Sequence, residues 1–497
     1  LVQHLEGVHH VAQVLGHLAA LGILNVAHDD AVFKGRAVEQ HRRNGLQGIE
    51  PAAGLIHCFG NKICRELLLE QIRNKRAKEL VAHEITSHIE DQEEAYRAQG
   101  LTAYDAERRA VLDMGDPVET GVSLDAVHKP KMSWSMVILT AMISVLGVFM
   151  IGMLCKGTSD FSTISLLRKQ IIYLMIGFGI MLFICKIDYS RIFRYSGILA
   201  ILYLGFLFLQ DMQFVHLFSN TVTIPYLLSI PIFCGLLYKF RKRSWYHLLI
   251  PVGFMLASIL LMRYQWFFSS YKLVLAFISA VLVTVVICNN WYPVYKRIVL
   301  PILWGCVVGI PTLSLLVPYK FPNLFPPYVS ARISNWIYPF SVENANQSMV
   351  HEAMTRSTLF GHSSTLIMDL NSLISDYMII NVTSRYGIIP ACILAVLFIV
   401  FCVRLFYLAL NQKNQLGMII GLGCSLVLTV EVFKYFLMNL GFIPMTYGFL
   451  PLFSYGGSVT IISYIFVGIL LSIYRNQNLI DETRQKHLRI HFTIEQE

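Results

Sequence analysis

Asp376 is the residue of this chain best placed for acid–base chemistry. It comes near the end of a polar segment, residues 318–387, and is followed closely by the apolar Met378 and the apolar run 388–409. A carboxylate at the edge of an apolar region loses part of its hydration, which raises its pKa toward the range useful for a general base. Asp is also favoured at the N-terminal end of a helix. The position therefore predicts either a general base or a helix cap.

Glu431 and Lys434 are a second candidate, because they place two opposite charges inside the apolar run 416–439. Charges at membrane depth are costly and usually face the interior of a helix bundle. Residues three apart on a helix can neutralise each other. The spacing favours a structural ion pair, and a proton or ion pathway is the alternative.

The segment 441–457, GFIPMTYGFLPLFSYGG, interrupts the apolar C-terminal region. Its helix-breaking residues are Pro444, Gly448, Pro451, Gly456 and Gly457. Irregular backbone at membrane depth occurs only where it is buried in protein or lines a polar cavity. We therefore predict a working site inside a helical bundle. A turn-rich loop outside the membrane is the alternative.

The elements that position these residues are expected to be membrane-spanning helices. The 497 residues are 55% hydrophobic and 14% charged, with a mean hydropathy of +0.56, unlike ordinary soluble domains. Ten runs approach the ~20 apolar residues that a spanning helix needs. They are 133–154, 170–186, 195–211, 223–239, 246–263, 271–289, 298–317, 388–409, 416–439 and 458–474. We predict an all-α fold, a polytopic membrane protein of about ten transmembrane helices.

Basic residues predict the orientation of these helices. Clusters follow the second, fourth and sixth runs: Lys186, Arg191 and Arg194; Lys239, Arg241, Lys242 and Arg243; Lys296 and Arg297. All lie on the cytoplasmic side if both termini are cytoplasmic, as the positive-inside rule requires. The segment 318–387 then forms one large outer loop within a membrane domain over 131–477, and residues 478–497 form a cytoplasmic tail.

The first 130 residues are polar and predict a separate region. Residues 1–60 stay unassigned, and upstream sequence that is not native coding sequence is one interpretation. Residues 61–130 predict a cytoplasmic helical module, in which Thr102 and Asp105 begin one helix. His83 and His88 resemble a zinc-protease signature, but five residues of separation place them ~140° apart on a helix, so we expect a solvated face. The ten cysteines show no paired or metal-ligand spacing, and we assign them no metal or disulfide.

Three stretches of the apolar region match the motifs of one known family. The first runs from Arg168-Lys169-Gln170 to Ile187-Asp188-Tyr189. The second includes Arg332-Ile333-Ser334, Asn346-Gln347-Ser348, Leu359-Phe360-Gly361, Ser375-Asp376-Tyr377 and Gly387, and the third includes Pro444-Met445-Thr446, Pro451 and Ser454-Tyr455-Gly456-Gly457. Together, over 133–475, they resemble the SEDS family (shape, elongation, division and sporulation) of FtsW, RodA and SpoVE. Residues 61–130 resemble the permease-prefix helical modules fused to some membrane proteins.

This resemblance implies a peptidoglycan glycosyltransferase of the bacterial cytoplasmic membrane, serving division, cell shape or sporulation. Such an enzyme joins lipid II at the outer face, with a class B penicillin-binding protein as partner and no nucleic acid. The family's catalytic carboxylate carries over to Asp376. We expect the substrate at Ser454, Tyr455, Gly456 and Gly457, and either Arg332 and Arg356 or a divalent cation at the leaving pyrophosphate.

Departures from the family pattern leave two other functions open. The family's fourth helix begins QPSELxK, whereas its Glu and Lys positions here hold Leu227 and Ile230. The paired glutamates before Gly387 are replaced by Ser384 and Arg385. One alternative is therefore a non-catalytic scaffold or regulator of cell-wall synthesis. The other is a transporter (flippase) of a lipid-linked precursor, with Glu431 and Lys434 along its route.

Overall fold

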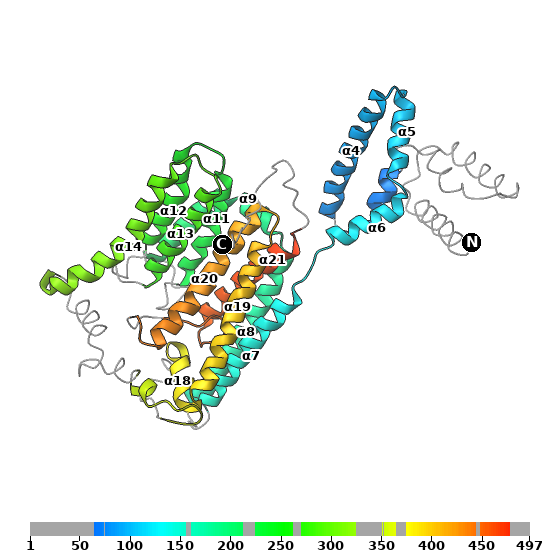
Figure 1. The fold of residues 1–497 in the computed structure, drawn as a ribbon. Helices are drawn as coiled ribbons and strands as arrows, with labels where there is room; N and C mark the ends of the chain where they lie inside the picture. Colours follow the sequence, from blue (N-terminus) through cyan, green and yellow to red (C-terminus); the bar gives the residue numbers. More distant parts are fainter. Residues whose placement is uncertain are drawn as a thin grey trace, which may run out of the picture. The chain divides into compact units, whose positions relative to one another are not determined.

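The computed structural model describes most of the chain (Figure 1). The described residues are 64–73, 75–155, 161–211, 224–261, 270–324, 350, 352–363, 374–443 and 448–477. Residues 1–60, Arg332, most of the loop 318–387, Pro444 and the tail 478–497 lie outside them. The chain divides into two compact units, Leu1–Lys129 and Pro130–Glu497.

The smaller unit contains α4 (Lys75–Ala98), α5 (Ala103–Asp113) and α6 (Pro117–His128). The Thr102 hydroxyl accepts a hydrogen bond from the Asp105 N–H at 3.2 Å, which confirms the predicted start of α5. The Arg73 N–H donates to Asp125 of α6 at 3.0 Å and joins that helix to the segment before α4. His83 and His88 are exposed on α4, as the sequence predicts.

Within its described residues, the larger unit contains seven helices that are long and apolar enough to cross a membrane. They are α7 (Trp134–Cys155), α8 (Phe161–Lys186), α13 (Ser270–Cys288), α14 (Lys296–Lys320), α19 (Ile388–Leu410), α20 (Gln415–Asn439) and α21 (Gly457–Arg475). Three shorter apolar helices are α10 (Ser196–Asp211), α11 (Ser229–Lys239) and α12 (Leu249–Leu260). Each predicted run is therefore helical, and the prediction of a polytopic helical membrane protein is confirmed.

Shorter helical elements connect these spans. They are α9 (Tyr189–Arg194), α18 (Met378–Tyr386) and the 3-10 turns η1 (Ile224–Leu228), η2 (Trp245–Leu248) and η3 (Pro322–Leu324). Asp188 caps α9 by accepting a hydrogen bond from the Ser190 N–H at 3.0 Å. Asp376, by contrast, lies one residue before Tyr377, the N-cap residue of α18, and α18 has no side-chain cap. The structure therefore does not use Asp376 as a helix cap.

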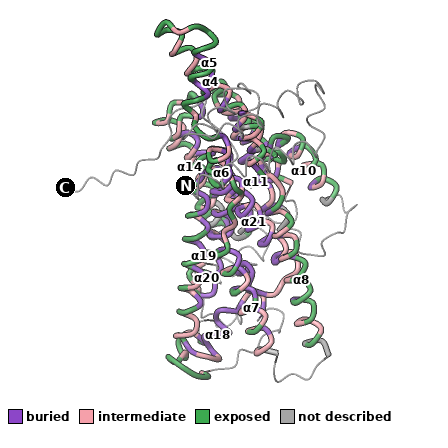
Figure 2. Tube along the Cα trace, turned by 90° about the vertical axis from the view of Figure 1, so that its right-hand side faces the viewer, coloured by how far each residue is buried: buried purple, intermediate pink, exposed green. Residues whose placement is uncertain are grey.

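Helix α20 is the centre of the larger unit and packs against α11, α13, α19 and α21. Buried residues make up 78% of its apolar span, against 17% for α8. Figure 2 shows this contrast, with buried residues in purple on the central helices and exposed ones in green on outer helices such as α8 and α10. A helix enclosed by protein can carry polar groups that lipid would not tolerate. The burial of α20 is thus the condition for placing Glu431 and Lys434 on it.

Candidate active site

Asp376 lies in a short turn between Ile374 and α18, and the C-terminal end of α20 holds that turn. The Tyr435 hydroxyl donates to the Ser375 carbonyl at 2.8 Å and accepts from the Met378 N–H at 2.9 Å. The Asn439 amide donates to the Asp376 carbonyl at 3.0 Å. Three backbone groups around Asp376 are thus fixed by two side chains of one helix.

The segment 448–457, which follows α20, contacts the other side of the Asp376 turn. The Gly448 N–H donates to Asp376 Oδ1 at 3.4 Å, and the Tyr455 N–H donates to the Ile374 carbonyl at 3.0 Å. Leu452, in the same segment, is buried and has φ 66°, a conformation that non-glycine residues adopt only where tertiary contacts enforce it. The segment 448–457 is therefore packed against the Asp376 turn inside the protein, and the prediction of a working site there and the alternative of a loop outside the membrane both stay predictions.

The residues Ser454 to Gly457 attach this segment to α8. The Gly456 N–H donates to the buried Gln170 side chain at 3.2 Å, and Gln170 donates to Thr460 of α21 at 3.3 Å. Ser454 is 1% exposed, and its hydroxyl accepts from the Leu450 N–H at 3.1 Å. A Cβ on Gly457 would lie 2.8 Å from the Tyr173 ring, so only glycine permits this approach. These contacts position the start of α21, and the substrate contacts expected of the four residues stay a prediction.

Burial sets the ionisation of Asp376. Loss of hydration raises the pKa of its carboxyl to about 6, while the Gly448 N–H and the Lys434 ammonium act in the opposite direction. At pH 7 a group with that pKa has about ten carboxylates for each protonated carboxylic acid. Asp376 can therefore accept a proton at neutral pH, and its conjugate acid is weak enough to hold it during a reaction.

Glu431 and Lys434 form the ion pair that their spacing predicts. Lys434 Nζ lies 2.6 Å from Glu431 Oε2, and the side chains are 7% and 0% exposed. Lys434 Nζ also lies 4.2 Å from the centre of the Tyr271 ring on α13. Beyond their ion pair, neither charged group makes a hydrogen bond to another described residue. Because Lys434 also attracts the Asp376 carboxylate, the pair is electrostatically connected to the candidate base.

Arg356 pairs with a neighbouring glutamate rather than with the residues around Asp376. Its guanidinium pairs with Glu352 Oε1 at 2.7 Å, and both side chains are more than half exposed. The loop residues Thr358 and Leu359 pack against Gly387. Gly387 has φ 98°, and a Cβ added to it would lie 2.5 Å from the Leu359 carbonyl oxygen. Arg332 falls outside the described residues. The predicted roles of both arginines therefore stay predictions.

Two residues that hold the Asp376 turn, Tyr435 and Asn439, are absent from the sequence-based site. A signal for them exists, because Glu431, Tyr435 and Asn439 recur every four residues and so share one face of α20. A polar stripe of this kind on an otherwise apolar span marks a face turned toward protein. Gln170 gives a weaker signal, since a single glutamine near a helix end has many other uses.

The chain is similar to proteins of bacterial cell-wall synthesis. The family model described as "Cell cycle protein", for FtsW, RodA and SpoVE, matches residues 238–479. The probable peptidoglycan glycosyltransferase FtsW of Hydrogenovibrio crunogenus is 26% identical over 174 residues, 33% of this chain and 44% of that protein. The peptidoglycan glycosyltransferase MrdB of Escherichia coli K12 is 28% identical over 109 residues, 22% of this chain and 30% of that protein. The chain thus aligns with less than half the length of these two relatives.

A solved structure shares the fold. A chain from a structure titled "Structural coordination of polymerization and crosslinking by a peptidoglycan synthase complex" superposes with a TM-score of 0.54 and 21% identity. The match covers 70% of this chain and 98% of that one. With the helical bundle and the family match in agreement, this chain is a multi-pass membrane protein whose residues 238–479 match the SEDS family of FtsW, RodA and SpoVE.

Proposed function

We propose that this protein is a peptidoglycan glycosyltransferase that polymerises lipid II at the outer face of the bacterial cytoplasmic membrane, with Asp376 as general base. The observation that carries the proposal is the setting of Asp376. It is a half-buried carboxylate with a raised pKa, in a turn held by α20 and by the segment 448–457. The relatives named as glycosyltransferases support the same reaction class.

The reaction follows from the chemistry of a lipid-linked sugar. A hydroxyl oxygen of the acceptor sugar attacks the anomeric carbon of the donor, and the bond from that carbon to the pyrophosphate oxygen breaks. Asp376 takes the hydroxyl proton, and polyprenyl pyrophosphate leaves with the bonding electrons. A base whose pKa is about 6 is suited to this transfer near neutral pH.

The leaving pyrophosphate needs positive charge close to it. Lys434 is the described cation that acts electrostatically on Asp376, and we propose that it stabilises negative charge during the reaction. Arg332 and Arg356, or a divalent cation, are the further candidates from the sequence. The described residues bring no three His, Cys, Asp or Glu side chains together, so we assign no step to a metal.

A transpeptidase partner is part of this proposal. The structure with the matching fold is titled as a complex that coordinates polymerization and crosslinking. We propose that this chain likewise works with a class B penicillin-binding protein. Co-purification of such a protein from the native membrane is the direct check.

A polymerisation assay tests the proposed function. The full chain, purified in mild detergent, is given lipid II, and glycan strands are separated by gel electrophoresis. We expect product from the wild type and at least a hundredfold less from Asp376→Asn, within the 10²–10⁴-fold range of general-base catalysis. Asn retains an acceptor oxygen for the Gly448 N–H, and a cooperative unfolding transition at or above the wild-type temperature confirms that the variant is folded. Equal product from both proteins would remove Asp376 from the mechanism.

One observation favours the scaffold alternative. Leu227 and Ile230, which stand at the family's Glu and Lys positions, are both fully buried at 0% exposure. No polar group from these two positions can therefore reach a substrate. The same assay separates the functions, since a scaffold gives no glycan strands with wild-type protein although partners co-purify. Movement of labelled lipid without polymer would instead identify a transporter.

A further inference from the structure

A pocket of about 630 Å³ lies at the opposite end of α20 from Asp376. It is formed by the loop between α11 and η2, which contributes Lys242 and Arg243, and by residues 290–295 between α13 and α14. The Lys242 N–H donates to the Trp291 carbonyl at 2.8 Å and joins the two loops. Arg241 donates to Gln415, the first residue of α20, at 2.7 Å and fixes the first loop to the bundle.

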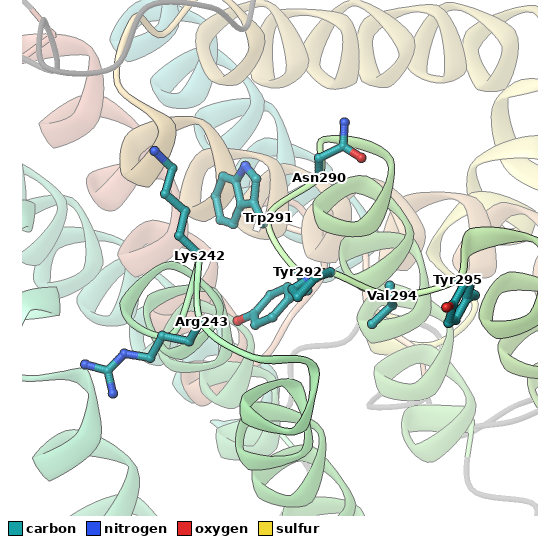
Figure 3. A pocket seen from close by; sticks show the side chains of 8 residues that line it. Lys242, Arg243, Asn290, Trp291, Tyr292, Val294 and Tyr295 are labelled. Carbon is teal, nitrogen blue, oxygen red and sulfur yellow. The ribbon is translucent and has the colours of Figure 1, made fainter.

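The shape of the pocket depends on two residues with positive φ and on a hydrogen bond to α11. Lys242 has φ 60° and Asn290 has φ 55°, conformations that non-glycine residues seldom adopt. The Tyr292 hydroxyl donates to the Leu237 carbonyl of α11 at 2.8 Å and fixes the floor. Figure 3 shows the side chain of Lys242 and that of Asn290 extending on the same side as the Trp291 ring.

The pocket carries positive charge and hydrogen-bond donors that the protein itself does not neutralise. Neither loop contains an acidic residue between positions 240 and 248 or between 289 and 297. The Lys242 ammonium makes no ion pair or hydrogen bond with a described side chain, whereas Lys296 donates to the Cys288 carbonyl at 3.0 Å. Trp291 is 3% exposed, and its indole N–H has no acceptor among the described residues. A buried donor without a partner is uncommon and indicates an acceptor that the chain does not supply.

The surroundings of the pocket are those of a membrane–water interface. Tyr295, Trp245 and Tyr246 are exposed by 83%, 59% and 53%, and each stands at the end of an apolar helix. Exposed tyrosine and tryptophan concentrate at the level of lipid headgroups. The basic residues beside them predict the cytoplasmic leaflet, where anionic lipids attract lysine and arginine.

We propose that this pocket binds the phosphate group of an anionic phospholipid of the cytoplasmic leaflet. Lys242 and Arg243 supply the charge, the Trp291 indole and the Asn290 amide supply donors, and the acyl chains lie along the apolar helices α12 and α13. This site is separate from the proposed reaction at Asp376, so it is tested by lipid binding without any polymerisation assay.

The test is native mass spectrometry of the full chain in mild detergent, with phosphatidylglycerol or phosphatidylcholine added. We expect the wild type to retain phosphatidylglycerol preferentially. Each cation near an anionic lipid contributes about fivefold to affinity, so Lys242→Gln with Arg243→Gln is expected to weaken retention by on the order of 20-fold. Arg191→Gln with Arg194→Gln removes the same charge from exposed positions on α9 and is the matched control. Trp291→Phe tests the indole N–H alone and is expected to cause a smaller loss.

The outcomes decide the proposal. A preference lost in the Lys242 and Arg243 variant and kept in the control supports it. A preference that survives this variant, or that falls equally in the control, overturns it. Binding of inorganic phosphate without a preference for phosphatidylglycerol would assign the pocket to a soluble phosphate and overturn the lipid as its source.

Discussion

The charged residues near the two ends of α20 differ in sign and in burial. At the Asn439 end, Asp376 is half-buried and its turn is held by side chains from α20 and by the segment 448–457. At the Gln415 end, Lys242 is exposed and has no acidic residue in its loops. The two sites are separated by a helix of 25 residues, about 37 Å long.

This difference corresponds to the two roles that we propose, a reaction at Asp376 and lipid binding at Lys242. A buried ionisable group responds strongly to its neighbours, because there is little water to screen them. An exposed cation attracts ligands through its charge, and dissolved salt weakens that attraction. The following predictions test whether the two ends differ in this way.

The largest expected effect is on the pH dependence of polymerisation. Because Asp376 must be ionised to act as a base and its pKa is about 6, activity should fall about tenfold for each pH unit below 6. The residual activity of Asp376→Asn should not follow this profile. Rates measured from pH 8 to pH 4 check this, and a wild-type profile that stays level through pH 6 would contradict it.

The raised pKa of Asp376 also predicts how the stability of the folded protein changes with pH. The folded pKa of Asp376 lies above its ordinary value of 3.8, so the folded state binds more protons between these two pH values. This group therefore favours folding at low pH, and its contribution is lost as pH rises through 6. Denaturation of wild type and Asp376→Asn across pH 4–7 should show the difference between them growing in that window.

Replacing Lys434 should be the most destabilising single change. Lys434→Met leaves Glu431 buried without its partner, which costs about 3–5 kcal/mol. It also removes an attraction that lowers the pKa of Asp376, so the activity profile should move to higher pH. Unfolding in denaturant and pH–rate profiles measure the two effects.

The controls for Lys434 come from both ends of α20. Glu431→Gln with Lys434→Met removes the pair together and should recover most of the stability, while the shifted profile remains. Lys242→Gln changes an exposed lysine and should alter stability by less than about 0.5 kcal/mol. A similar cost for Lys434→Met and Lys242→Gln would abolish the contrast between the two ends.

Two tyrosines give a matched pair of smaller effects. Tyr435→Phe leaves the Ser375 carbonyl and the Met378 N–H without their partner and should cost about 1–3 kcal/mol. Tyr292→Phe removes a single bond to the Leu237 carbonyl and should cost about 1 kcal/mol. We expect only Tyr435→Phe to lower the turnover number. Equal turnover numbers in the two variants would show that the activity does not depend on the Tyr435 hydrogen bonds to the Asp376 turn.

A small effect on stability is also expected at Arg356. Its ion pair with Glu352 is exposed, and such pairs contribute at most about 1 kcal/mol. If Arg356 binds the pyrophosphate, Arg356→Gln raises KM for lipid II with little change in unfolding, and this is the result we expect. An unchanged KM would leave Lys434 as the described cation of the site.

Much of the architecture could be predicted from local pattern. The apolar runs predicted the ten long or apolar helices described in the larger unit, and Thr102 with Asp105 predicted the start of α5. The pairing of Glu431 with Lys434 also followed from spacing on one helix. Tyr435, Asn439 and Gln170 were missed, because each acts on a backbone group at least 50 residues away in the sequence or on a distant helix.

The sequence alone determined that this protein is a helical membrane protein and which long apolar helices it contains. Those properties depend on hydrophobicity and periodicity, which are local. The tertiary structure decided that Asp376 is clamped by α20, that Gly448 and Lys434 act on its charge, and that two loops form a pocket around Lys242. These properties depend on which distant segments meet, because burial and hydrogen bonding set ionisation only once the helices are packed together.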